Sequence, residues 1–202
     1  MSFSIGGVRI TIRFFFFAFL SLLSITAGAQ MILSSVLFSL LHEFGHLSAM
    51  LWFGCKPDEV RLGAFGMEIR RAPGIQMSYR QEMIVLLAGP TVNLVFSAAF
   101  IAGGFFYKAG LFYPGIVNLV LAVFNLLPVS GTDGGEALYC ALVRRLSQST
   151  AHLLCGILSF VFFCGLYTLV FFLSLRGSFP LSLFGVLVYL TAITLLRLPS
   201  SR

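Results

Sequence analysis

The residue types and spacing of His42-Glu43-Phe44-Gly45-His46 are those of a zinc-hydrolase motif. On a helix, residues four apart lie on one face, so the imidazoles of His42 and His46 can bind the same Zn²⁺. Glu43 borders that face and can take a proton from a metal-bound water. The chemistry this predicts is hydrolysis of an amide bond by zinc-activated water.

The segment that carries the motif is apolar over a length that suits a membrane span. The run from Met31 to Phe53 exceeds the roughly 20 residues that cross the hydrocarbon core of a bilayer. Ionisable side chains at that depth are costly and usually serve a function. The alternative is a polar seam between helices, formed by the same three side chains without metal. We expect a zinc and water site inside the membrane.

Composition indicates the class of protein. Apolar residues make up 58% of the chain and charged residues only 10%, which is typical of an integral membrane protein. We expect an all-α polytopic fold in a single transmembrane metalloprotease domain over 1–202, with the catalytic core at about 31–145. The predicted spans, about six in all, are Ile10 to Ala27, Met31 to Phe53, Met83 to Tyr107, Tyr113 to Leu127, His152 to Leu175, and Phe179 to Leu196.

The basic residues predict the orientation in the membrane. With the amino terminus in the cytoplasm, every Lys and Arg except Lys108 and Arg176 falls on the cytoplasmic side of the predicted spans. Both termini are then cytoplasmic, and the membrane is most simply the bacterial cytoplasmic membrane. This topology and attraction to anionic lipid account for the net charge of +6 without a nucleic-acid partner.

A second polar cluster follows the predicted fourth span. Pro128 and the glycines at 131, 134 and 135 predict a broken helix at 125–135. Irregular backbone at membrane depth is tolerated only where it is buried in protein or lines a wet cavity. A catalytic zinc usually has three protein ligands, and Asp133 in this break is the candidate for the third. The alternative is that Asp133 is a solvated turn residue at the mouth of the span.

The loop between the second and third predicted spans has a strand-like pattern. Alternating apolar residues and glycines over 57–72 predict a short membrane-associated β-hairpin or loop. An exposed strand edge there could hold a substrate segment in extended form by β-augmentation. The alternative is a simple connection whose arginines contact lipid headgroups.

Three segments together resemble the marks of the site-2 protease family of intramembrane zinc metalloproteases, peptidase family M50. They are His42-Glu43-Phe44-Gly45-His46, Ala88-Gly89-Pro90-Thr91-Val92-Asn93, and the pattern of Asn125, Pro128, Asp133 and Gly134. The short six-span layout, with the histidine helix second, is similar to the sporulation-type branch of the family. The resemblance covers about half of the chain.

The resemblance implies a ligand set and a mechanism. His42, His46 and Asp133 would bind one Zn²⁺ per chain, and Glu43 would act as the general base of a zinc metalloendopeptidase. Asn93 and Asn125 would lie near the substrate, where their amides could stabilise an oxyanion. The alternative for both asparagines is an interhelical hydrogen bond without a role in chemistry.

The chain also departs from the family. It ends at Arg202 without the nucleotide-sensing domain common in the sporulation-type branch, it has no PDZ insertion, and 129–132 replaces the usual approach to the aspartate. The expected partners are a membrane-associated or single-span protein substrate, the bilayer, and a regulatory or inhibitory membrane protein. The rival function is a non-catalytic zinc-binding membrane protein, either a transporter or an inactive scaffold. Glu43 argues against that rival, because a binding site needs no base beside its ligands.

Overall fold

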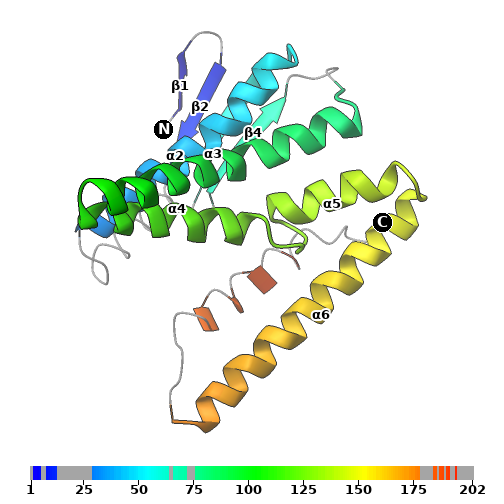
Figure 1. Cartoon of the computed structure of the whole chain (residues 1–202). Helices are drawn as coiled ribbons and strands as arrows, with labels where there is room; N and C mark the ends of the chain where they lie inside the picture. The colour runs from blue at the N-terminus through cyan, green and yellow to red at the C-terminus, as the bar shows by residue number, and fades with distance from the viewer. Residues whose placement is uncertain are drawn as a thin grey trace. The chain divides into compact units, whose positions relative to one another are not determined.

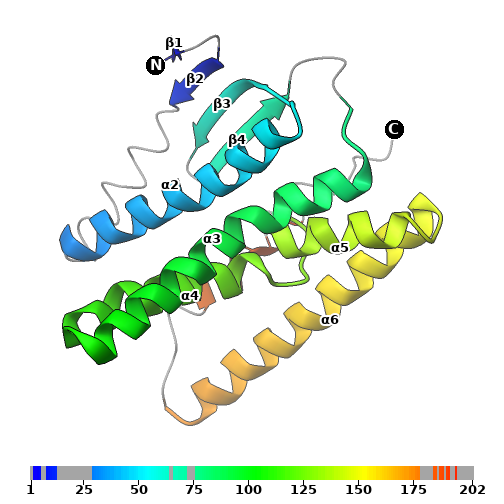
Figure 2. The same ribbon diagram turned by 45° about the horizontal axis from the view of Figure 1, so that its top comes forward.

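The computed structural model describes residues 2–5, 8–12, 29–63, 66–71, 76–177, 184–185, 187–188, 190–191 and 194. The chain divides into two compact units, Met1–Val123 and Phe124–Arg202. Figures 1 and 2 label their helices and strands.

The first unit contains a four-stranded sheet in the order β1-β2-β3-β4. The strands are β1 (Ser2–Ile5), β2 (Val8–Ile12), β3 (Pro57–Gly63) and β4 (Gly66–Arg71). β1 and β2 pair antiparallel, β2 and β3 pair parallel, and β3 and β4 pair antiparallel. The hairpin predicted at 57–72 is therefore present as β3 and β4.

The two amino-terminal strands correct the all-α prediction and the start of the first predicted span. Ile10 was placed at the beginning of a transmembrane helix, whereas it lies in β2 opposite Val60 of β3. The physical reason is a short alternation of apolar and polar residues over 8–12, which suits a strand, joined to the apolar run that follows. The remainder of that predicted span, residues 13–27, lies outside the described residues.

The sheet order also changes which strand edge is open. β3 lies between β2 and β4, so among the described strands only β1 and β4 have an unpaired edge. One side-chain hydrogen bond links the inner pair, where Thr11 Oγ1 donates to Glu59 Oε1 over 2.8 Å. Of the predicted hairpin, β4 is thus the strand with an edge on which a further strand could add.

Two long helices complete most of the first unit. They are α2 (Ala29–Trp52), which corresponds to the second predicted span, and α3 (Tyr79–Phe106), which begins slightly before the third. A capping box formed by Ser78 and Gln81 fixes the start of α3. The two helices run alongside each other in both views of Figures 1 and 2.

Small residues let α2 and α3 approach closely. A Cβ atom added to Gly45 would lie 2.8 Å from the carbonyl oxygen of Ala88 and 2.9 Å from Cγ2 of Val92. Small residues at such crossings are typical of helix pairs in membranes, where close van der Waals packing replaces the hydrophobic effect. This crossing brings the motif helix against the Ala88–Asn93 segment.

A short 3₁₀ turn, η1 (Ala109–Leu111), leads into α4 (Phe112–Asn125). α4 takes the place of the fourth predicted span. Its 14 residues extend only about 21 Å at 1.5 Å per residue, which is shorter than the hydrocarbon core of a bilayer. Its end at Asn125 agrees with the helix break predicted at 125–135.

The second unit contains α5 (Asp133–Val143) and α6 (Gln148–Leu175). α6 includes the fifth predicted span, and Ser147 caps its amino terminus. Part of the sixth predicted span is described, and Leu187 and Leu190 in it are buried in the core cluster of this unit. Among the described residues, α3 and α6 are the helices that are long and apolar enough to cross a membrane.

Candidate metal centre

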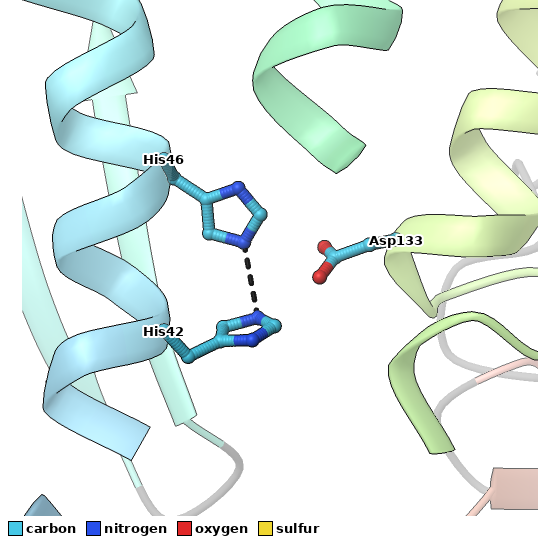
Figure 3. Close-up of side chains that lie close together, drawn as sticks. All are labelled: His42, His46 and Asp133. Carbon is cyan, nitrogen blue, oxygen red and sulfur yellow. Dashed lines mark hydrogen bonds between the residues drawn. The ribbon is translucent and has the colours of Figure 1, made fainter. Parts of the chain in front are cut away.

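His42 and His46 lie one turn apart on α2 and point the same way. Both side chains are buried, with exposed fractions of 6% and 8%. Their Nε2 atoms are 3.1 Å apart, the contact dashed in Figure 3. Two ligands bound tetrahedrally at about 2.0–2.1 Å from one zinc ion would be separated by about 3.3 Å. The histidine pair therefore fits a single zinc ion bound through both Nε2 atoms.

The backbone of α3 fixes the protonation of His46. Its Nδ1 atom lies 2.7 Å from the carbonyl oxygen of Val85. A carbonyl oxygen only accepts hydrogen bonds, so Nδ1 must carry the proton and donate it. In the neutral ring this leaves a lone pair on Nε2, the atom that faces His42. His46 is thus held in the tautomer that binds metal through Nε2.

Gly89 of α3 lies directly against both imidazoles. A Cβ atom at this position would fall 2.6 Å from Cε1 of His46 and 2.8 Å from Nε2 of His42. Only a residue without a side chain leaves that space to the rings. Neither Gly89 nor Val85 was predicted as a site residue, although Gly89 lies in the Ala88–Asn93 segment that carries part of the family resemblance.

The predicted site residue Asn93 also lies at this centre. Its side chain is fully buried, and its Nδ2 atom is 3.2 Å from Nδ1 of His42. Glu43, next to His42 on α2, is partly buried, whereas the following Phe44 is exposed. The first unit therefore brings His42, His46 and Asn93 together and places Glu43 beside them in the chain.

Asp133 belongs to the second unit and is positioned differently from the prediction. It is the first residue of α5 rather than a loop residue. Thr132 is the N-cap, and its Oγ1 accepts from the backbone N–H of Gly135 over 3.3 Å and donates to the carbonyl oxygen of Leu127 over 2.6 Å. Asn125, the other predicted site residue of this unit, is the last residue of α4.

The glycines after Asp133 allow the preceding loop to fold tightly under α5. A Cβ atom on Gly134 would lie 2.8 Å from Cα of Leu126, and one on Gly135 would clash with the carbonyl oxygen of Val129. The loop is also tied to α6, because Ser159 Oγ accepts from the backbone N–H of Ser130 over 2.9 Å. The position of Asp133 within its unit therefore rests on backbone packing that side chains at 134 and 135 would prevent.

Comparisons with known proteins identify the fold. No model of a known protein family matches the chain. It is 27% identical over 135 residues to the Stage IV sporulation protein FB of Bacillus subtilis, covering 63% of this chain and 46% of that protein. It is 33% identical over 132 residues to the putative zinc metalloprotease Rip3 of Mycobacterium tuberculosis, covering 60% of this chain and 32% of that protein. The chain thus spans less than half the length of these relatives.

A solved structure matches along the whole chain. The site-2 protease from Methanocaldococcus jannaschii superposes with a TM-score of 0.65 at 23% sequence identity, covering 100% of this chain and 98% of that one. The chain thus has the fold of this site-2 protease. In this chain, the Ala88–Asn93 segment has a physical role, because it forms the surface on which the two motif histidines rest.

We expect Gly89→Ala to lower the affinity for zinc by about tenfold or more, because the new methyl group displaces both imidazoles. The measurement is zinc bound per purified chain across a series of chelator concentrations. Gly156→Ala in α6 is the matched control, since a Cβ atom there meets nothing within 4 Å. Unchanged zinc binding by Gly89→Ala would show that the rings do not depend on this contact.

Proposed function

We propose that the chain is a zinc metalloendopeptidase that hydrolyses peptide bonds of membrane-associated or transmembrane proteins within the bilayer. The observation that carries the proposal is the pair of buried Nε2 atoms 3.1 Å apart on an apolar helix, with Glu43 next to one of them. The name of the Rip3 relative, a putative zinc metalloprotease, supports the same reaction. The names of the relatives give no support to a transporter or an inactive scaffold.

Asp133 is the proposed third ligand. Its carboxylate would add an oxygen donor to the two imidazole nitrogens of His42 and His46, and Figure 3 labels these three side chains. Two imidazole nitrogens and one carboxylate oxygen are a donor set that zinc takes in catalytic sites. If these three residues hold zinc, the ion would keep one position for water, which a hydrolase requires.

The proposed mechanism assigns one task to each side chain. His42, His46 and Asp133 would hold zinc, which would supply Lewis-acid activation of a water molecule. Glu43 takes a proton from this water as the water oxygen attacks the scissile carbonyl carbon. Glu43 then passes the proton to the nitrogen of the leaving amine. The amide of Asn125 is proposed to donate a hydrogen bond to the carbonyl oxygen as it becomes negative.

A helical substrate has to be extended before it is cut, because its scissile carbonyl is hydrogen-bonded within the helix. The open edge of β4 is the proposed place of extension, since β3 is paired on both sides. A strand added there exchanges helical hydrogen bonds for ladder hydrogen bonds. The substrate is a membrane-associated or single-span protein, and a membrane partner that restricts access to the site is part of the proposal.

We predict that Glu43→Gln keeps its zinc and loses cleavage by at least about a hundredfold, in the range typical for a general base. The change is isosteric and removes only the ability to accept the proton. Bound zinc and cleavage of a membrane-tethered substrate are measured on the same preparation. A Glu43→Gln variant that cuts at the wild-type rate would refute the mechanism.

Asp133→Ala should instead lower the zinc content itself, because it removes one of three ligands. Metal analysis of the purified variant tests this without a substrate. Asp58→Ala is the matched control, since Asp58 is the only other aspartate in the chain and is exposed in β3. Equal zinc content in Asp133→Ala and wild type would remove Asp133 from the ligand set.

Both termini are proposed to lie in the cytoplasm of a bacterial cell, which the distribution of Lys and Arg along the sequence supports. A reporter that is active only in the cytoplasm, fused after Arg202, should therefore be active. The physical reason is the bias of Lys and Arg toward the cytoplasmic ends of spans. Activity at this position only with a reporter that works in the periplasm would contradict this orientation.

A further inference from the structure

We propose that Asn93 is a positioning residue that accepts a hydrogen bond from Nδ1 of His42 and holds its Nε2 atom ready for zinc. This assignment replaces the predicted role of Asn93 as an oxyanion donor. It rests on the proposed function, because it concerns the same metal site.

The two histidines must carry their protons on the same ring atom. Both Nε2 atoms face a common point and are 3.1 Å apart, so binding one ion requires both to be unprotonated. Each neutral ring then has its proton on Nδ1. For His46 that proton goes to the carbonyl oxygen of Val85. For His42 the group next to Nδ1 is the amide of Asn93, at 3.2 Å.

The side-chain oxygen of Asn93 is the acceptor available to the Nδ1 proton of His42. Within the described residues, Asn93 Oδ1 is buried and has no hydrogen-bond partner, while Nδ2 faces the His42 ring. A rotation of the amide by 180° exchanges the two atoms and sets Oδ1 against the Nδ1–H of His42. The rotation pairs Oδ1 and moves Nδ2 to the place that Oδ1 held, so the reason for this orientation is the Nδ1 proton of His42, which zinc binding through Nε2 requires.

Three residues on one face of α3 contact the two imidazole rings. Val85, Gly89 and Asn93 are four residues apart in turn and therefore follow one face of the helix. The outer two supply acceptors for the Nδ1 protons of His46 and His42, and the central glycine provides the surface under both rings. Partners of this kind orient metal-bound histidines and set their tautomer.

The test compares zinc affinity in four versions of the full chain, wild type, Asn93→Leu, Asn93→Asp and Asn118→Leu, by competition with a chromophoric chelator. Asn93→Leu should bind zinc about 10–100-fold more weakly, the usual cost of losing such a partner. Asn93→Asp should stay within a few-fold of wild type, because its carboxylate accepts from Nδ1–H. Asn118→Leu is the matched control, since Asn118 in α4 is also fully buried with an unpartnered Oδ1 among the described residues, and its affinity should not change.

The outcomes separate this inference from the proposed function. If Asn93→Leu binds zinc as wild type does but loses cleavage, Asn93 acts on the substrate, and the inference fails while the protease proposal stands. If wild type binds no zinc, both fail. Nitrogen NMR of histidine-labelled, zinc-loaded wild type gives the same decision without a variant. Metal on Nε2 and a proton on Nδ1 of His42 are expected, and metal on Nδ1 would overturn the assignment.

Discussion

The contact between α2 and α3 has to hold two buried imidazoles with their Nε2 atoms 3.1 Å apart. A buried imidazole has no bulk water to satisfy its other ring nitrogen, so the protein must do so. α3 provides the carbonyl oxygen of Val85 for one ring and the amide of Asn93 for the other. The position of α3 is therefore set by the histidines as much as by packing.

This constraint explains why small residues gather where α2 meets α3. An acceptor on α3 reaches a ring on α2 only if the two backbones come close, and the contacts of Gly45 with Ala88 and Val92 show that they do. A larger residue at either glycine of the crossing would separate the helices or fill the space of the rings. Overpacking of this kind typically costs about 1–3 kcal/mol, and here the same displacement would also move the metal ligands.

The sequence predicted those parts of the fold that depend on local patterns. The motif, the helix break after Asn125 and the β3–β4 hairpin each lie within a short segment whose composition indicates it. The parallel pairing of β2 with β3 joins Arg9 to Glu59, and the Asn93 amide meets a ring 51 residues away. No local pattern specifies such partners, so the pairing of β2 with β3 and the contact of Asn93 with His42 were not predicted.

In the second unit, α5 begins with an aspartate, Asp133. Thr132 already caps the helix, so capping does not account for the carboxylate of Asp133. The helix dipole favours an acidic residue in the first turn by about 0.3–1 kcal/mol. Glu136 lies in the same turn and also accepts from the backbone N–H of Gly131 over 3.3 Å. Neither local effect requires a second acid at 133, whereas the proposed role as a zinc ligand does account for a carboxylate there, on a backbone held by the close packing of Gly134 and Gly135.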